Sequence, residues 1–372
     1  MIALQKQEDK AKTYWKQKYT IYFFSLFLGV VFLVLIYFSG VSEILAGSSY
    51  RIAKSYYPAL FLYLLFFFIF YRIFNLPLLY FSFILEKKYS LSNQKTLSWF
   101  FDLLKSDILS FIFSLILIGS LYFLLQNIFW AWWLLLAFIY LFFTLFISRL
   151  FPVLILPLFF KYKDIKNEDV KNAIAETMKK AKVQVADVFE IDFSKKTKKS
   201  NAAVIGIGPK KRLIIADNLI RNFTIEEIKA VLAHELAHYK YNHIWRLIIL
   251  NSTIILLTFY LMDIAAVGIF RVLGINNIYD IKAFPIFAVL FYVFSFIFMP
   301  FQNAYSRKIE QDADRFSVQI VGKDQFIHAM ERLSAENLAD INPPFIIKIL
   351  LYSHPTIKER INFARRIGEL TK

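Results

Sequence analysis

VLAHELAHYKYNH, residues 231–243, carries two histidines, His234 and His238, four positions apart on a stretch with helical character. Side chains at this spacing lie on one face of a helix, so both imidazoles can reach a single metal ion. Glu235 stands beside the first histidine, where a carboxylate can take a proton from a metal-activated water. This is the HExxH pattern of zinc hydrolases, and it leads directly into an apolar segment of membrane-spanning character.

The composition is that of a polytopic membrane protein. Of the 372 residues, 58% are hydrophobic and the mean hydropathy is +0.50, which is more apolar surface than a soluble core of this size can bury. The lysines behind the net charge of +16 are spread over loops between apolar runs, as lipid headgroups and topology require. We therefore expect a lipid bilayer, and no nucleic acid, as a partner. Because the chain has no cysteine, any metal site must use His and carboxylate ligands.

Six apolar runs are long enough to span a bilayer. They cover residues 21–38, 58–85, 108–125, 128–147, 247–270 and 283–301. Lys and Arg are dense on alternate sides of these runs, which places both termini and the histidine motif on the cytoplasmic side. The sequence therefore predicts a mainly α-helical, multi-pass membrane protein whose helices enclose a cavity. We divide it into an N-terminal membrane region with four spans, residues 1–160, and a domain that carries the HExxH motif and two further spans, residues 161–372.

The stretch between the fourth and fifth runs has the pattern of soluble structure. Residues 167–182 carry apolar side chains at helical spacing and predict an amphipathic helix. VFEIDF at 188–193 alternates as a strand does, and NAAVIGIG at 201–208 followed by RLIIA at 212–216 predicts a small β-hairpin. Thr224, followed three positions later by a glutamate, has the form of a capping box, so the HExxH helix is expected to begin there.

A catalytic zinc held by two histidines needs a third protein ligand and an open position for water. SRKIEQDADRF, residues 306–316, follows the sixth run and offers Glu310 with Asp314 one helical turn later. The glutamate can complete the ligand set, and an aspartate on the same face can orient a ligating imidazole. An ordinary charged helix at a membrane exit explains the same residues, so these residues alone leave both interpretations open.

HELAHYKYNH at 234–243 and SRKIEQDAD at 306–314, separated by one pair of membrane runs, resemble the type I CAAX prenyl protease family of integral-membrane gluzincin endopeptidases. The likeness extends to the stretches 75–102, 150–162, 200–220 and 352–360. It implies that one Zn²⁺ is bound by His234, His238 and Glu310. It further implies that Glu235 is the general base and that Asp314 supports a ligand histidine.

The resemblance also implies a substrate site. Asn201, with Ala202 and Ala203, lies on a strand that in the family pairs with an extended peptide through main-chain hydrogen bonds. His354 corresponds to a histidine near the reaction centre that can donate a hydrogen bond to the developing oxyanion. Apart from the resemblance, a turn asparagine and a surface histidine explain these positions. The implied activity is hydrolysis of membrane-associated peptides or proteins, for example removal of the C-terminal tripeptide of prenylated CAAX proteins.

Eukaryotic members of the family have seven spans, whereas six are expected here. This indicates a compact bacterial or archaeal enzyme in the cell membrane, with its active site on the cytoplasmic side. A site-2-type intramembrane protease is an alternative, but it would need its motif inside a lipid-embedded helix and an aspartate ligand from another span. A scaffold or transporter with a structural metal would need a fourth ligand. His243, five residues beyond His238, is the nearby candidate and is expected not to reach the same ion.

Overall fold

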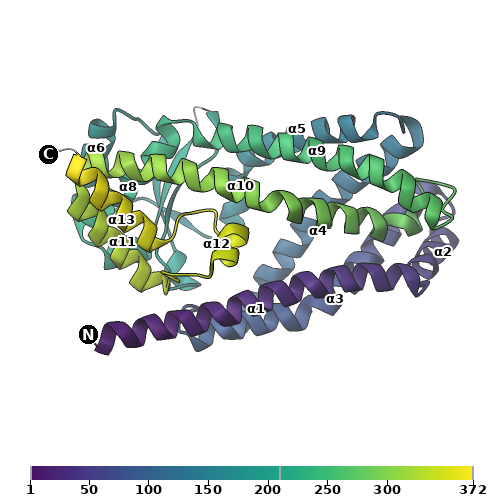
Figure 1. Ribbon diagram of the computed structural model, residues 1–372, viewed down its shortest axis with the longest axis horizontal. Helices are drawn as coiled ribbons and strands as arrows, with labels where there is room; N and C mark the ends of the chain where they lie inside the picture. Colours follow the sequence, from purple (N-terminus) through teal and green to yellow (C-terminus); the bar gives the residue numbers. More distant parts are fainter. Residues whose placement is uncertain (1, 209–210, 371–372) are drawn as a thin grey trace.

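A computed structural model describes residues 2–208 and 211–370, and its long helices run along the length of the molecule (Figure 1). The helices before the soluble part are α1 (Ile2–Phe38), α2 (Val41–Ala53), α3 (Tyr56–Lys88), α4 (Thr96–Asn127) and α5 (Trp132–Leu150). After the soluble part, α9 (His243–Val272) and α10 (Phe284–Val321) complete the bundle. In the described part of the chain, 6 helices are long and apolar enough to cross a membrane, which confirms the predicted spans.

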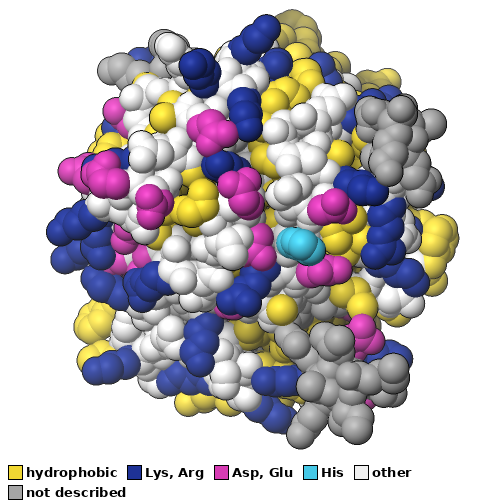
Figure 2. All heavy atoms as spheres, turned by 90° about the vertical axis from the view of Figure 1, so that its left-hand side faces the viewer, with side chains coloured by type: hydrophobic (Ala, Val, Ile, Leu, Met, Phe, Trp, Pro, Cys, Tyr) yellow, Lys and Arg dark blue, Asp and Glu magenta, His cyan; other side chains and the backbone are white. Residues whose placement is uncertain are grey.

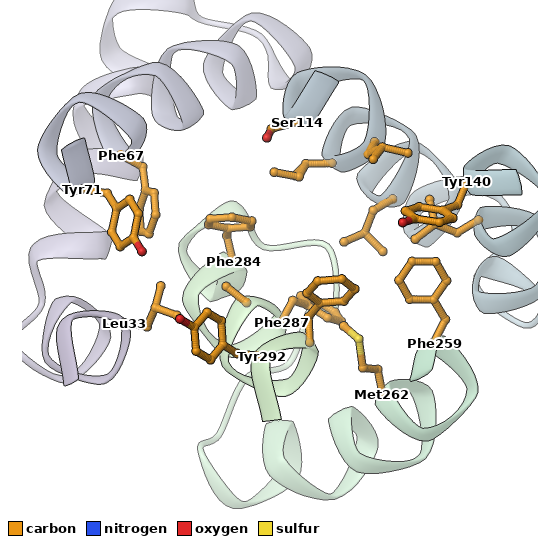
Figure 3. A pocket seen from close by; sticks show the side chains of 16 residues that line it. Leu33, Phe67, Tyr71, Ser114, Tyr140, Phe259, Met262, Phe284, Phe287 and Tyr292 are labelled. Carbon is orange, nitrogen blue, oxygen red and sulfur yellow. The ribbon is translucent and has the colours of Figure 1, made fainter. Parts of the chain in front are cut away.

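The bundle is apolar outside as well as inside. Side chains such as Phe27, Phe142 and Ile249 are exposed on its surface, as they are on helices that face lipid. Inside, a cavity of about 370 Å³ lies between α1, α3, α4, α5, α9 and α10 (Figure 3). Its lining is almost entirely apolar, with Phe67, Phe284 and Phe287 among the contributing side chains. The predicted arrangement of helices around a cavity is confirmed.

Two features of the membrane region differ from the sequence prediction. The first is α2, which the hydropathy pattern does not reveal because it is short and half polar; Gly40, with φ of 78°, turns the chain into it. The second is the start of α4 at Thr96, well before the apolar run 108–125, so the loop between α3 and α4 is limited to residues 89–95. The polar first turns of α4 remain helical because they contact other elements, for example through the ion pair between Asp102 and Lys196.

The soluble part contains a four-stranded mixed sheet with the order β1-β2-β4-β3. Its strands are β1 (Tyr162–Lys163), β2 (Asp187–Ile191), β3 (Ala202–Ile205) and β4 (Arg212–Ala216). The predicted hairpin of β3 and β4 is present, but it does not stand alone, because β2 pairs in parallel with β4 and β1 pairs with β2. β3 is an edge strand, so one side of it is free of strand partners.

The soluble part also contains six α-helices in the described residues. They are α6 (Glu168–Ala181), α7 (Asp217–Asn222), α8 (Ile225–Lys240), α11 (Lys323–Asn337), α12 (Phe345–Leu351) and α13 (Ile357–Leu370). Short π and 3-10 turns occur at Phe151–Ile155, Leu156–Leu158, Phe193–Lys195 and Ile281–Ala283. The predicted amphipathic helix is α6, and Asn167 caps its N-terminus by accepting from the amide of Asp169 at 2.9 Å.

Two helices bring the histidine motif and the later acidic residues together. α8 begins with the predicted capping box, in which Thr224 and Glu227 exchange hydrogen bonds. Asn242, with φ of 53°, separates α8 from the membrane helix α9. α10 continues without a break from the far end of the bundle into the soluble part, where Ser317 Oγ donates to Ala230 O of α8 at 2.7 Å. The 38 residues of α10 therefore fix the soluble part to the bundle.

The two ends of the molecule differ in character. The end formed by α6, α11 and α13 is covered with Lys, Arg, Asp and Glu side chains (Figure 2). α1 reaches the same end, where Trp15 Nε1 donates to Leu338 O at 2.7 Å. The opposite end holds α2 and the connection between α9 and α10. Tyr56, the first residue of α3, donates a hydrogen bond to Tyr279 O in this connection at 2.7 Å. The soluble part and the N-terminal half of α1 thus share one end, as the charge alternation predicts.

Candidate active site

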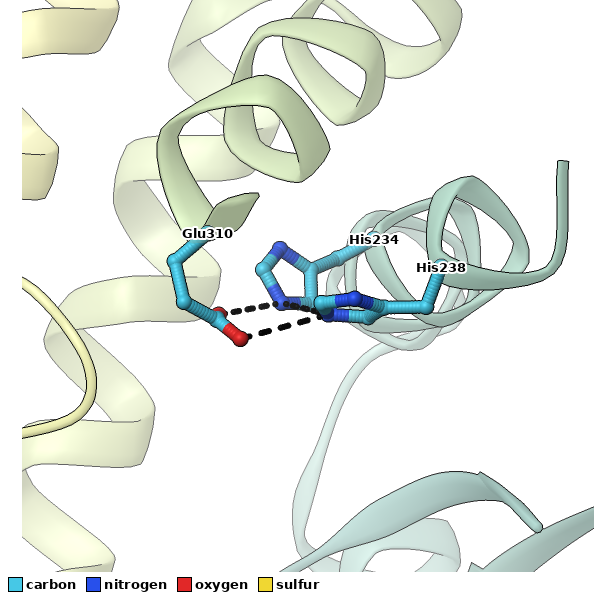
Figure 4. A group of neighbouring side chains, drawn as sticks. All are labelled: His234, His238 and Glu310. Carbon is cyan, nitrogen blue, oxygen red and sulfur yellow. Dashed lines mark hydrogen bonds and ion pairs between the residues drawn. The ribbon is translucent and has the colours of Figure 1, made fainter. Parts of the chain in front are cut away.

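Three of the predicted residues meet between α8 and α10. His234 and His238 point their Nε2 atoms toward each other at 3.2 Å, and Glu310 approaches from α10 (Figure 4). Glu310 Oε2 lies 3.1 Å from His234 Nε2, and its Oε1 lies 3.5 Å from His238 Nε2. One nitrogen or oxygen atom from each residue lies within 4.8 Å of those of the other two. The structure therefore brings together residues from two segments that are about 70 positions apart in the sequence.

This group of donor atoms fits a metal ion. Glu310 Oε2 is buried and has no hydrogen-bond partner among the described residues, although His234 Nε2 is close to it. A buried carboxylate oxygen without a partner is costly, and a cation between the three side chains would satisfy it. Burial lowers the pKa of His238 to about 3, which keeps its ring neutral and able to bind a metal. Two imidazoles with one carboxylate form a donor set typical of catalytic zinc sites.

The other ring nitrogen of His234 is held by Asp314, whose side chain is fully buried. His234 Nδ1 lies 2.9 Å from Asp314 Oδ1, so the aspartate accepts the Nδ1 proton and leaves Nε2 free for a metal. Burial lowers the pKa of His234, but the proximity of the Asp314 and Glu310 carboxylates outweighs burial and raises that pKa to about 9. Asp314 therefore contacts the nitrogen of His234 that faces away from the group of donor atoms.

Arg360 of α13 completes this buried network. Its Nε donates to Asp314 Oδ2 at 2.9 Å, and its guanidinium lies 3.2 Å from His234 Nδ1. The sequence analysis does not identify this residue, although it ends the matched stretch 352–360. An arginine in a basic C-terminal helix looks like a surface residue, and only the packing of α13 against α10 reveals that it is buried.

His238 has a partner of its own. His243 at the start of α9 is fully buried and places its Nδ1 3.0 Å from His238 Nδ1, on the side of the ring that faces away from Glu310. As predicted, His243 does not join the group of donor atoms. The spacing of five residues excludes it as a ligand but does not disclose this contact, because the turn at Asn242 sets its position.

Glu235 lies on the strand side of α8. Its Oε2 accepts a hydrogen bond from Val204 N of β3 at 3.3 Å. Burial raises the pKa of the Glu235 carboxyl to about 7. A carboxylate whose pKa lies near neutral pH is well matched to accept a proton and to release it again.

The free side of β3 opens onto this site. Ala216 N donates to Asn201 O at 2.9 Å, and β3 pairs with β4 in antiparallel register. Main-chain N–H and C=O groups alternate in direction along an antiparallel strand. Those of Asn201 and Ala203 therefore point toward β4, whereas those of Ala202 and Val204 point away from it. Of the three residues expected to bind substrate, Ala202 is the one whose N–H and C=O face the free edge. Main-chain pairing of a substrate with Ala203 does not agree with this register.

His354 lies in the connection between α12 and α13. Its Nε2 is 3.4 Å from Glu310 Oε1, and its side chain is 59% exposed. Together with Glu235, Ala202 and Val231 it lines a pocket of about 250 Å³ beside the donor atoms. Its exposed ring can therefore form a hydrogen bond with a molecule bound in this pocket.

Comparisons with known proteins agree with this geometry. The sequence profile of peptidase family M48 matches residues 164–367, and the profile described as CAAX prenyl protease N-terminal, five membrane helices, matches residues 2–161. The chain is 30% identical over 297 residues to the uncharacterized metalloprotease YhfN of Bacillus subtilis, covering 78% of this chain and 70% of that protein. It is 27% identical over 327 residues to CAAX prenyl protease 1 of Saccharomyces cerevisiae, covering 80% and 70%.

The fold also matches a solved structure. The crystal structure of Ste24p from S. mikatae superimposes with a TM-score of 0.82 at 23% identity, over 96% of this chain and 88% of the other. At this identity the match concerns the fold alone, whereas the profiles and the bacterial relative concern the family. The chain belongs to peptidase family M48 and is an integral-membrane metalloprotease.

Proposed function

We propose that the protein is a zinc endopeptidase in which His234, His238 and Glu310 bind the metal and Glu235 is the general base. The observation that carries the proposal is the convergence of three donor atoms around a buried carboxylate oxygen without a hydrogen-bond partner in the described residues. Glu235 stands between this group and a free strand edge, as peptide hydrolysis needs.

Each side chain has a separate task in this reaction. A zinc ion in the group would polarise the scissile carbonyl and acidify a water. Glu235 accepts the proton of that water and passes it to the leaving amine. His354 donates a hydrogen bond to the oxyanion, and Asp314 with Arg360 holds the ring of His234 in place.

The substrate is a peptide that reaches the site from the membrane, with the C-terminal tripeptide of prenylated CAAX proteins as the first candidate. The yeast relative is named a CAAX prenyl protease, and the site lies where a six-helix apolar bundle meets the soluble part. The active site belongs to the cytoplasmic side of a bacterial or archaeal membrane. The Lys-rich and Arg-rich end of the molecule, which shares that side, supports this orientation.

The test combines metal analysis with proteolysis in detergent. A farnesylated CAAX peptide and the same peptide without the lipid are incubated with the wild type, Glu235→Gln and Glu310→Ala. We expect one zinc per wild-type chain, cleavage of the farnesylated peptide, retention of zinc without cleavage in Glu235→Gln, and loss of zinc in Glu310→Ala. Removal of a general base lowers the rate by about 100-fold or more. Cleavage by Glu235→Gln at near the wild-type rate would refute the assigned base.

A further inference from the structure

Asn337, the last residue of α11, closes one end of the β3 edge. Its Oδ1 accepts a hydrogen bond from Ser200 N at 2.8 Å, and its Nδ2 donates to Ser200 O at 3.1 Å. One side-chain amide thus bonds both main-chain groups of a single residue, in the way that a neighbouring strand would. Ser200 lies two residues before the first residue of β3, so a peptide that pairs with this edge meets Asn337 at its end.

The alternation along β3 shows how much edge remains. Ser200, Ala202 and Val204 share the side that faces away from β4. Asn337 occupies the main-chain groups of Ser200, and Val204 N bonds to Glu235. Ala202 lies between these two fixed points and lines the pocket beside the donor atoms. The open edge is therefore short, with the proposed general base at one end and the Asn337 amide at the other.

Asn337 is itself held in place from outside the peptidase unit. Leu338, with φ of 49°, ends α11 directly after it, and Trp15 of α1 donates to Leu338 O at 2.7 Å. Tyr19 of α1 donates to Asp340 at 3.0 Å in the same connection. The amide is thus braced by the first membrane helix, so a substrate cannot displace it without breaking these contacts.

The pocket beside the donor atoms extends to this end of the edge, where part of its lining is apolar. Met330, Leu333 and Ala339 line it together with Asn337 and the β3 edge. A short peptide segment therefore finds main-chain pairing at Ala202 and an apolar volume for one of its side chains, but no room to continue the strand past Ser200.

We propose that Asn337 limits the length of the peptide on the C-terminal side of the scissile bond. The proposal rests on the proposed peptidase function. From Val204 to Ser200 the strand advances four residues, or about 13 Å. A peptide that adds to β3 in the more frequent antiparallel direction points its C-terminal side toward Ser200. It therefore runs for about three to four residues from Glu235 to the Asn337 amide, which corresponds to a C-terminal tripeptide. A longer C-terminal segment must leave the edge and loses its main-chain hydrogen bonds there.

The test measures cleavage of one core peptide that is lengthened either on its N-terminal or on its C-terminal side. For the wild type, kcat/KM should be unaffected by N-terminal extension and should fall about tenfold once more than about four residues follow the scissile bond, as expected for the loss of two main-chain hydrogen bonds. Absence of cleavage in every peptide would refute the proposed function. Cleavage that is equally fast for all C-terminal lengths, or that falls with N-terminal extension, would refute the stop alone.

Asn337→Ala separates a length limit from a purely structural role. Without the amide, Ser200 can pair with a longer substrate, so the ratio of kcat/KM for the extended and short peptides should rise about tenfold. Asn222→Ala is the matched control, because Asn222 donates to the neighbouring Glu336 at 3.1 Å and should leave the ratio unchanged. A proportional fall for both peptides in Asn337→Ala would show a structural role. If that variant does not fold, Asn337→Asp, which keeps only the acceptor, should raise the ratio partly, and an unchanged ratio would overturn the proposal.

Discussion

The two histidines of the motif are each held through the nitrogen that faces away from the donor group, but by different partners. Asp314 accepts from His234, whereas His238 faces the neutral ring of His243 at 3.0 Å. If His238 binds a metal through Nε2, its remaining proton is on Nδ1 and donates to His243. The proton of His243 must then be on Nε2, which is buried without a partner among the described residues. In that case His243 fixes the orientation of the His238 ring without joining the group of donor atoms.

Replacement of His243 should weaken metal binding. His243→Leu removes the acceptor for His238 Nδ1, and we expect zinc affinity to fall by about 10- to 100-fold, as it does when a hydrogen-bond partner of a ligand is lost. In His243→Gln the zinc affinity should fall less, because the side-chain carbonyl oxygen of Gln can accept the same proton. Zinc affinity is measured by competition with a chelator, and His328→Leu on α11 is the control. Equal affinity in the Leu variant and the wild type would exclude this role.

At the scale of elements, residue spacing within one helix predicts well which side chains share a face. The sequence does not predict how separate elements pack against one another. The four-residue interval predicts that His234 and His238 share a face, and the same interval predicts that Asp314 lies near Glu310. The positions of Arg360 and Asn337 and the pairing of β2 with β4 depend on how distant segments pack, and a single sequence contains no distance between them. Hydropathy does not predict the short helix α2 for a different reason, because about half of its residues are polar. These residues form hydrogen bonds with the connection before α10, as Ser42 does with Lys282 O at 2.7 Å.

The register of β3 makes neighbouring positions respond differently to proline. Ala202→Pro removes an amide that faces the open edge, so the fold and the metal should be retained while KM for peptide rises a few-fold, because one hydrogen bond contributes about 0.5 to 1.5 kcal/mol net. Ala203→Pro removes an amide that bonds to β4 and should lower the thermal stability instead. Michaelis constants and thermal unfolding of both variants test the register. A higher KM with intact stability in Ala203→Pro alone would mean that the register is wrong.

At the scale of the whole molecule, the donor group lies where the membrane bundle and the soluble part share a helix. α10 spans about 57 Å, from the cavity-lining residues near Phe284 to the buried end of the helix beyond Asp314. α1 adds a second connection, because its N-terminal half contacts the connection that follows Asn337. Neither helix can move relative to the bundle without disturbing the site, so the bundle holds the catalytic geometry as well as the membrane position.

This arrangement leads to a topology that can be measured. The loop 89–95 contacts the soluble part, where Asn93 N donates to Lys196 O at 3.0 Å, so both should face the cytoplasm. The connections at the other end should face outward. Because the chain has no cysteine, Lys95→Cys, Arg51→Cys and Asn276→Cys each introduce a single thiol. An impermeant thiol reagent should label positions 51 and 276 in intact cells and position 95 only after the membrane is opened. Labelling of position 95 in intact cells would reverse the orientation and place the peptidase site outside the cytoplasm.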